Sequence, residues 1–555
     1  MPLIDVNAVS YAHPGGSELF SDVSFRVAGG RHAALIGANG AGKTTLLQLI
    51  AGQVRPSDGS VFLDGSVQLM PQAIGSGEGG DGGTIRELLG RFGPPRLVTG
   101  AAALVAAERA NDADPSEATG IALAEAVGQW GELGGYHEEA RWDACCQRVL
   151  RQTFDEAGDR PVAELSGGER KRLVLESVFA SDVDILLLDE PDNFLDLSAK
   201  RWLEHQIATS SKTILLVSHD RELLAACADL VVMVEGAGAW VHPGSFAGFD
   251  DARRARNADL GAVAARWHDE ERRLFQHYKT MKQRASISDA NASRANAAES
   301  RWQRFVDVGP PPPPPTERDV HLRLAGSRSG ERVLQVEGLE IVGLTDPFDL
   351  EVFYGDRVAV LGPNGSGKSH FLRLLGGADD IETEGSWRIG ARVDVGLFHQ
   401  TDEVEWLTDR TPIEALAQLD LTRHAAMAAL ARYGLEDGAD RDVDTLSGGQ
   451  KARLQVLGLE LRGVNLLLLD EPTDNLDLLS AQALETALEG FAGTVVCVTH
   501  DRWFMRTFDR RVVFAHDCSV KEVADLDSAL HLVTGDDAYE FRRSSVKELT
   551  VRGSR

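Results

Sequence analysis

Short runs of apolar residues recur along the chain and predict buried strands and helices. Residues 33–36 and 358–361 are continuously apolar, and each run leads into a glycine-rich segment. Apolar positions return at residues 46–50 and 371–375 with the spacing of a helix. A buried strand, a glycine-rich turn and a helix in this order predict an α/β fold at both places.

Two more pairs of apolar runs end in charged motifs. Residues 185–188 and 466–469 lead directly into Asp-Glu, whereas residues 214–217 and 495–498 are followed one residue later by His-Asp-Arg. Such runs are typical of parallel strands that are buried on both faces. Because parallel strands present ligand-binding residues at their carboxyl ends, we expect the acidic residues and the histidines to share one edge of a sheet.

These motifs form an internal repeat, since one ordered set occurs twice. The intervals from the serine of a Leu-Ser-Gly-Gly motif to the glutamate and to the histidine are identical in the two copies. The first copy contains Gly37, Asn39, Gly40, Gly42, Lys43, Thr44, Gln72, Ser166, Gly167, Gly168, Asp189, Glu190 and His219. The second copy contains Gly362, Asn364, Gly365, Gly367, Lys368, Ser369, Gln400, Ser447, Gly448, Gly449, Asp470, Glu471 and His500.

The glycine-rich segments have the pattern Gly-x-x-x-x-Gly-Lys-Thr/Ser of a phosphate-binding loop. Glycines allow successive backbone N–H groups to point at phosphate oxygens. Lys43 and Lys368 are expected to reach the β- and γ-phosphates, and Thr44 and Ser369 are expected to bind Mg²⁺. The repeat therefore predicts two sites for ATP.

The Asp-Glu pairs are candidates for metal binding and catalysis. Asp189 and Asp470 are expected to hold Mg²⁺ through water, while Glu190 and Glu471 polarise the attacking water. A solvated strand end is the alternative for an Asp-Glu pair. The phosphate loop upstream and the histidine downstream disfavour that alternative.

The histidines and glutamines complete each predicted site. His219 and His500 occur at the same place in both copies, which favours contact with the γ-phosphate over a purely structural role. Gln72 and Gln400 are assigned to the metal and the lytic water, although glutamine after a strand is common.

Composition narrows the classes of function. A chain of 555 residues with 43% hydrophobic and 26% charged residues accommodates two or three globular domains. No apolar run approaches the roughly 20 residues of a bilayer span, so we expect a cytoplasmic protein. The five cysteines lack the CxxC spacing of metal ribbons. The formal net charge of -28 repels nucleic acid, so any RNA contact requires a locally basic element.

A basic segment separates the two copies. Residues 253–304 contain 12 Arg and Lys against 6 Asp and Glu and no proline, which predicts two helices around a break. Tyr278, Lys279, Lys282 and Arg284 lie near the expected tip, where basic side chains beside an aromatic ring suit RNA. A solvated charged linker is the alternative.

These features divide the chain into domains 1–247, 248–316 and 317–555, and six prolines at 310–315 form a stiff spacer before the last domain. The interval from the glutamine to the Leu-Ser-Gly-Gly motif is about twice as long in the first copy, which predicts an insertion at about 75–140. Its alanine-rich part is expected to be helical. A surface excursion and a binding arm both fit the insertion.

The Leu-Ser-Gly-Gly-Glu/Gln motif is the most discriminating one, and with it nearly the whole chain resembles the ATP-binding cassette (ABC) superfamily. The resemblance implies a head-to-tail pairing of two P-loop ABC-type nucleotide-binding domains joined by a helical hairpin linker. In that pairing Ser447, Gly448 and Gly449 face Lys43 across one ATP, and Ser166, Gly167 and Gly168 face Lys368 across the other. Tyr11 matches the aromatic residue that stacks on adenine, and Thr45 follows Thr44 in the loop.

Two cassettes, a basic linker and the lack of an apolar span resemble the ABC-F family. The resemblance implies a monomeric ATPase whose linker enters the ribosomal exit site near the P-site tRNA. Protection of the ribosome against antibiotics, which we favour, and general control of translation both remain open. The ATPase subunit of a drug exporter with separate membrane subunits is the main alternative, and it leaves the basic hairpin unexplained. A DNA-repair or chromosome-associated cassette would require coiled coils or zinc modules that the sequence lacks.

The sequence departs from the ABC-F pattern in three respects. The segments 190–196 and 471–477 differ from the usual Glu-Pro-Thr-Asn-His-Leu-Asp in the loop through which the domains communicate. Ile341 stands in the second copy where Tyr11 stands in the first. His370 follows Ser369 where Thr45 follows Thr44.

Overall fold

The computed structural model of the chain comprises two compact units. The first unit contains both motif copies in residues 1–241 and 320–555, and the second unit spans residues 242–319. The structure describes residues 3–13, 16, 18–74, 83–235, 238–285, 292–311, 330–398, 407, 409–446, 448–474 and 476–534.

The first copy is built on a six-stranded sheet of order β5-β6-β7-β3-β8-β9. Its strands are β3 (His32–Gly37), β5 (Val67–Met70), β6 (Ile185–Asp189), β7 (Thr213–Val217), β8 (Leu230–Glu235) and β9 (Gly238–His242). A second, antiparallel sheet has the order β2-β1-β4. It consists of β1 (Leu3–Ala12), β2 (Glu18–Val27) and β4 (Asp58–Asp64).

The second copy repeats this arrangement with the orders β14-β15-β16-β12-β17-β18 and β11-β10-β13. The larger sheet consists of β12 (Arg357–Leu361), β14 (Val395–Phe398), β15 (Leu466–Asp470), β16 (Thr494–Val498), β17 (Arg510–Phe514) and β18 (Val520–Val523). The smaller sheet consists of β10 (Arg332–Ile341), β11 (Phe348–Phe353) and β13 (Thr383–Ile389). The α/β fold that the apolar runs predict is confirmed in both copies.

Strand register brings the motif-bearing ends of the parallel strands to one edge. Asp189 lies opposite Val217, and Leu35 lies opposite the same valine, so β6, β7 and β3 end together. In the second copy Asp470 and Val360 both lie opposite Val498. Because β6 and β7 are buried along their whole length, the chain first meets solvent at this edge, which is where the polar motifs begin.

Helices α1 (Lys43–Ile50) and α12 (Lys368–Leu375) follow the central strands, and their buried leucines join the apolar core beneath each sheet. Apart from the helices of the insertion, the first copy also contains α6 (Phe154–Ala157), α7 (Gly167–Ala180), α8 (Leu197–Thr209) and α9 (Arg221–Cys227). Those of the second copy are α13 (Pro412–Ala417), α14 (Arg423–Arg432), α15 (Gly448–Arg462), α16 (Leu478–Glu489) and α17 (Leu526–Thr534). No described helix is long and apolar enough to cross a membrane.

The predicted insertion is helical and shares one apolar core with α6 and α7. It contains α2 (Ile85–Arg91), α3 (Pro95–Ala113), α4 (Glu117–Glu132) and α5 (Gly135–Leu150). Trp130 and Trp142 are fully buried there, with ring centroids 6.0 Å apart. Thr84 and Thr411 form equivalent capping boxes at the starts of α2 and α13. Since α2 therefore corresponds to α13, the added material is the α3–α4 pair.

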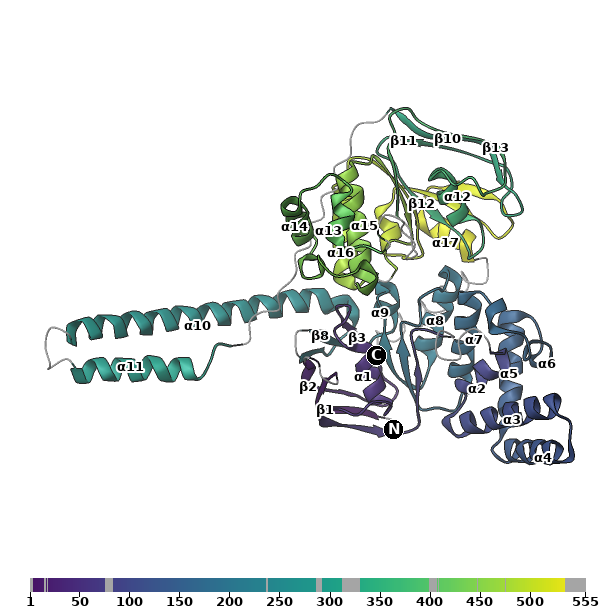
Figure 1. Cartoon of the computed structure of the whole chain (residues 1–555), viewed down its shortest axis with the longest axis horizontal. Helices are drawn as coiled ribbons and strands as arrows, with labels where there is room; N and C mark the ends of the chain where they lie inside the picture. The colour runs from purple at the N-terminus through teal and green to yellow at the C-terminus, as the bar shows by residue number, and fades with distance from the viewer. Residues whose placement is uncertain are drawn as a thin grey trace, which may run out of the picture. The chain divides into compact units, whose positions relative to one another are not determined.

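The second unit contains a hairpin of α10 (Phe249–Ala285) and α11 (Ala292–Asp307), which lie side by side in Figure 1. Aromatic rings join the two helices. Tyr278 stacks on Trp302 with centroids 5.7 Å apart and an interplanar angle of 2°, and Phe275 lies 5.2 Å from the same ring. The Tyr278 hydroxyl donates to Glu299 at 2.9 Å. The predicted break between two helices is confirmed, and residues 286–291 of the break lie outside the described residues.

We predict that Trp302→Ala loosens this hairpin, because it removes the ring against which both Phe275 and Tyr278 pack. The expected loss is about 1–3 kcal/mol of local stability. Hydrogen exchange should accelerate in the last turns of α10 and throughout α11. Ser300→Ala, an exposed position of α11, is the control and should leave exchange unchanged. Equal protection in both variants would contradict the packing role of the indole.

Candidate ATP-binding sites

In each copy the candidate phosphate loop connects the central strand to a helix. The first loop runs from Gly37, the last residue of β3, to Gly42, which precedes α1. Gly40 and Gly42 have φ values of 81° and 91°, and Gly365 and Gly367 have values of 79° and 95°. Because glycine adopts this left-handed backbone without strain, the loop conformation explains all four glycines.

The lysine of each loop is buried against the loop's own carbonyl oxygens. Lys43 Nζ donates to Gly37 O at 2.9 Å and to the next carbonyl at 3.1 Å. Lys368 Nζ donates to Gly362 O at 2.9 Å and to the next carbonyl at 2.6 Å. Burial lowers the pKa of both lysines, and neighbouring carboxylates oppose that change. Each ammonium group is thus positioned where phosphate oxygens could replace the carbonyls as its partners.

The first turns of α1 and α12 carry the remaining loop residues. Thr44 and Thr45 follow Lys43, and Ser369 and His370 follow Lys368. Ser369 Oγ donates to Asp470 Oδ1 at 3.2 Å, which joins the loop to the end of β15. His370 is exposed and lines the cavity beside Lys368, so its difference from Thr45 changes a side chain at the site.

In the first copy the candidate catalytic residues gather around Glu190. Gln72 Nε2 and Asn193 Nδ2 each donate to Glu190 Oε2 at 2.6 Å. His219 Nε2 lies 3.7 Å from Glu190 Oε1. Both carboxylate oxygens of Asp189 are buried without a hydrogen-bond partner among the described residues. The structure thus brings together four of the residues that the sequence singles out, and it adds Asn193.

In the second copy His500 is the main partner of Glu471. The backbone N–H of His500 donates to Glu471 Oε2 at 2.9 Å, and its Nε2 lies 3.6 Å from Oε1. Glu190 and Glu471 have matched φ values of 47° and 45°. A left-handed backbone is uncommon for glutamate and is found most often where function requires it. Gln400 lies outside the described residues.

Burial perturbs three carboxyls and two histidines at this edge. It raises the pKa of the Asp189, Glu190 and Glu471 carboxyls above the usual range. It also lowers the pKa of His219 to about 3 and that of His500 well below the usual value. Both imidazoles are therefore neutral at physiological pH, and both glutamates bind a proton more tightly than a solvated glutamate does.

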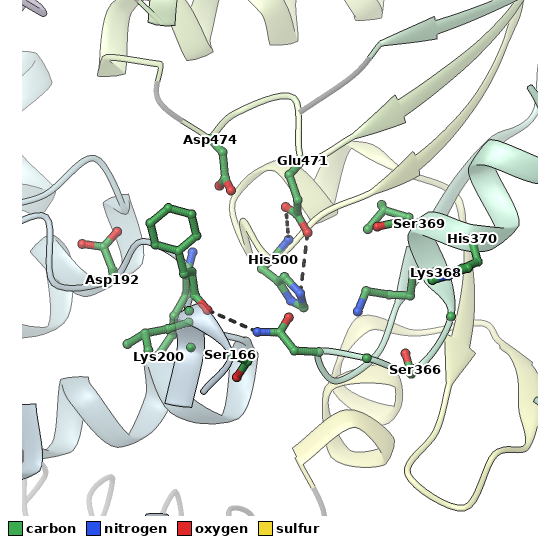
Figure 2. A pocket seen from close by; sticks show the side chains of 18 residues that line it. Ser166, Asp192, Lys200, Ser366, Lys368, Ser369, His370, Glu471, Asp474 and His500 are labelled. Atoms are coloured by element: carbon green, nitrogen blue, oxygen red, sulfur yellow. Dashed lines mark hydrogen bonds and ion pairs between the residues drawn. The ribbon is translucent and has the colours of Figure 1, made fainter. Parts of the chain in front are cut away.

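A cavity of about 380 Å³ is lined by residues of both copies (Figure 2). The second copy contributes Lys368, Glu471 and His500, and the first copy contributes residues 166–168. Ser166 caps α7 by accepting from the backbone N–H of Glu169, so its backbone is fixed at a helix N-terminus. This is the juxtaposition that the resemblance implies for one of the two ATP sites.

The other Leu-Ser-Gly-Gly motif is described only in part. Ser447 lies outside the described residues, and Gly448 and Gly449 begin α15. At the expected ATP site of the first phosphate loop, another contact links the two copies. The backbone N–H of Asn39 donates to Asp477 Oδ2 at 3.1 Å. The phosphate loop of the first copy therefore touches the loop that follows Glu471.

The loop after Glu190 makes the corresponding contact. Asn364 Nδ2 donates to the carbonyl oxygen of Phe194 at 3.2 Å. Phe194 has φ of 66°, and its side chain is exposed. Because the contact uses a backbone oxygen, phenylalanine satisfies it in place of the family's usual histidine.

Lys171 is a residue of this region that sequence reasoning missed. It lies on α7 and donates to the carbonyl oxygens of Glu190 and Gln72, the latter at 3.4 Å. Burial lowers the pKa of this lysine to about 8. Its only signal in the sequence is a cation five residues after Ser166, and a helix surface commonly carries such a residue.

The candidate for adenine stacking lies in β1. Tyr11 is half-buried, with its ring 6.3 Å from Phe20 and edge-on to His13 at 5.4 Å. Ile341 is only 2% exposed and belongs to the apolar core of the second copy. The first copy therefore has an aromatic ring that could stack on adenine, whereas the second copy has a buried aliphatic side chain at that position.

The sequence model of the ABC transporter family matches residues 20–193 and 345–474. An antibiotic resistance protein of Mycobacteroides abscessus is 46% identical, with 94% of this chain and 99% of the relative covered. ABC transporter F family member 2 of Arabidopsis thaliana is 29% identical, with 92% of this chain and 76% of the relative covered. Among solved structures, one described as a model of ribosome-bound archaeal Pelota and ABCE1 has a TM-score of 0.56 at 18% identity, covering 94% of this chain and 78% of that one.

The family match covers more than half of the chain, and a relative of nearly the same length is close to half identical. The α/β cores, the two phosphate loops and the paired carboxylates agree with that match. The chain belongs to the ATP-binding cassette family as an ABC-F-type ATPase with two cassettes that bind and hydrolyse ATP.

Proposed function

We propose that this ATPase binds the ribosome near the tRNA exit site and the P-site tRNA through its α10–α11 hairpin, as a monomer whose own two cassettes pair. The observation that carries the proposal is a basic helical hairpin in a unit of its own, within a chain that has two cassettes and no described membrane-spanning helix. We infer further that the action protects the ribosome against antibiotics. The antibiotic resistance relative, similar along its whole length, supports that choice over general control of translation.

Hydrolysis uses one glutamate and one histidine in each cassette. Glu190 and Glu471 act as general bases that orient and polarise the water attacking the γ-phosphate. The neutral His219 and His500 side chains contact the γ-phosphate, and each lies within 3.7 Å of its glutamate. Gln72 supports Glu190 through its 2.6 Å hydrogen bond.

The residues near each phosphate loop fit a magnesium ion. Asp189 has two buried oxygens without a hydrogen-bond partner among the described residues, and Ser369 Oγ is within hydrogen-bond distance of Asp470. Hydroxyl and carboxylate oxygens are the ligands that Mg²⁺ prefers. We therefore assign the ion to Thr44 and Asp189 in one site and to Ser369 and Asp470 in the other, with Gln72 and Gln400 nearby. The ion would neutralise charge that develops on the phosphate oxygens.

Lys279, Lys282 and Arg284 are the best candidates for RNA contact. All three are exposed in the last two turns of α10. Tyr278, which the sequence assigns to the same role, is half-buried against Trp302, and Lys282 Nζ donates to its hydroxyl at 2.6 Å. We therefore assign Tyr278 to supporting the tip and the three cations to phosphate contact.

We predict that Glu190→Gln combined with Glu471→Gln traps the protein on ribosomes. The substitutions remove the water-activating carboxylates and retain the nucleotide contacts, so turnover should fall roughly 100-fold or more while ATP still binds. The measurement is sedimentation of the double variant with 70S particles in the presence of ATP. Lys43→Ala with Lys368→Ala is the control, since it weakens ATP binding itself. A double variant that stays free of 70S particles and partitions to membranes would support the exporter alternative instead.

Neutralising the hairpin tip should separate RNA contact from catalysis. In Lys279→Gln/Lys282→Gln/Arg284→Gln, ribosome binding should weaken and its salt dependence should become shallower, because up to three phosphate contacts are lost. Basal ATPase activity without ribosomes should not change. The matched control neutralises Arg254, Arg272 and Arg273, three exposed cations elsewhere on α10. Equal weakening by both triple variants would argue against a dedicated tip.

The pH dependence of hydrolysis should reflect the raised pKa of the two glutamates. A base must be ionised, so kcat should fall as the pH drops below these raised values and should reach a plateau above them. We expect a decline of up to tenfold per pH unit on the acid side. The check is a kcat profile at saturating ATP, with fluorescent-ATP binding measured over the same range as a control. A flat profile would show that these carboxyls ionise normally.

A further inference from the structure

Two arginine–glutamate pairs link the cassettes in a reciprocal pattern. Arg221 of the first cassette donates to both oxygens of Glu485 of the second, at 2.9 and 3.1 Å. Arg502 of the second cassette likewise donates to both oxygens of Glu204 of the first. Each pair is bidentate, the geometry that best defines direction between a guanidinium and a carboxylate.

The sequence positions of these residues match between the pairs. Each arginine comes two residues after the histidine of its own cassette, His219 or His500. Each glutamate lies on the helix that follows the Asp-Glu loop, eight residues after the aspartate that caps that helix. Every pair therefore joins the histidine loop of one ATP site to helix α8 or α16 of the opposite cassette.

The same two helices are also attached at their beginnings. Asp477, the N-cap of α16, accepts from the phosphate loop of the first cassette at Asn39. Just before α8, the carbonyl oxygen of Phe194 accepts from Asn364 in the other phosphate loop. Eight helical residues span about 12 Å, so each helix reaches from the phosphate loop to the histidine loop of the opposite site.

The four side chains are withdrawn from solvent. Arg221 and Glu485 are 6% and 12% exposed, and Arg502 and Glu204 are 10% and 18% exposed. A charge in such a place is stable only with its partner, because the bare group keeps its desolvation cost. The pairs therefore restrict how each helix sits against the opposite histidine loop.

A third ion pair between the cassettes is more exposed and has no reciprocal counterpart. Arg506 binds Glu222, but its side chain is 53% exposed. The positions that correspond by distance from the histidine are Ala225 and Trp503, so this pair has no reciprocal counterpart. It provides a control within the same interface.

We propose that Arg221–Glu485 and Arg502–Glu204 are positioning pairs that couple the histidine loop of each ATP site to the opposite cassette. Each pair holds the histidine loop in register with the helix whose beginning contacts the phosphate loop of the same site. Loss of a pair should slow hydrolysis without weakening ATP binding, because none of the four side chains lines the cavity that the structure describes at Lys368, and the two pairs occupy matching positions. The proposal rests on the proposed roles of the two glutamates and the two histidines, and it does not depend on ribosome binding.

The test is a double-mutant cycle on the full chain with Arg221→Met and Glu485→Gln, repeated with Arg502→Met and Glu204→Gln. Each single variant should lower kcat about tenfold while KM for ATP stays within about twofold. The neutral double variant should be no slower than the slower single variant, since the two residues act as one unit. The exchanged pair, Arg221→Glu with Glu485→Arg, should recover much of the rate.

Arg506→Gln is the matched control and should change kcat less than about twofold. Independent losses that multiply in the double variant, or a rise in KM at constant kcat, would overturn the coupling role. Thermal melting and fluorescent-ATP binding distinguish a folding defect from a loss of coupling. Each neutral double variant removes both charges of a pair, and Asp220, which lies 3.8 Å from Arg502, retains Lys200 as a partner. If the glutamate variants of the ATP sites retained turnover, the proposed catalytic roles would fail. If only the variants of the two arginine–glutamate pairs retained full kcat, the coupling alone would fail.

Discussion

Each cassette places two adjacent carboxylates at the end of a buried strand, and the cost of withdrawing them from water shapes the surrounding structure. Asp189 and Glu190 in the first cassette, like Asp470 and Glu471 in the second, lie where three parallel strands end together. An anion in such a place needs a cation or hydrogen-bond donors nearby. The phosphate-loop lysine, the histidine loop and the amide donors of Gln72 and Asn193 supply them. A site arranged for compensating negative charge is also one that accepts a triphosphate and its metal ion.

This constraint explains what the sequence could predict. Strand ends, glycine-rich turns and acidic pairs are local features, so their spacing was enough to place Lys43, Glu190 and His219 at one edge. The left-handed backbone of Gly40 and Gly42 follows from the same local pattern. The α3–α4 pair was predicted only as a helical insertion, because nothing in its alanine-rich composition states which helices are added to the common framework.

Contacts between distant segments could not be predicted in the same way. Arg221 and Glu485 are each single charged residues on helices with no motif of their own, and 264 positions separate them. Tyr278 illustrates the opposite case, since an aromatic residue among cations suggested RNA contact. The structure gives its ring a partner, Trp302, from the other helix of the hairpin. Periodicity shows which residues share a face of a helix, but it does not show what covers that face.

Two buried lysines of the first cassette have no counterpart in the second. Lys171 and Lys200 in the first cassette correspond by motif spacing to Ala452 and Ala481 in the second. Lys171 contacts the backbone of Glu190, and Lys200 lies 3.3 Å from Asp220. Burial alone would lower the pKa of Lys200, but attraction to Asp220 and Asp192 raises it, so this cation persists inside the interface.

The consequence is that the two ATP sites are electrostatically unequal. Glu190 has a second buried ammonium group close to it in Lys171, whereas the corresponding position near Glu471 carries an alanine methyl group. Burial raises the pKa of both glutamates, and the phosphate-loop lysine opposes that change at each one, Lys43 at Glu190 and Lys368 at Glu471. Two sites with the same motifs and the same arginine–glutamate pairs thus differ in their buried cations, because Lys171 lies beside Glu190 whereas Lys200 lines the cavity at Lys368. The difference arises outside the motifs that define the family, on helices α7 and α8, where the corresponding described positions of the second cassette are alanines.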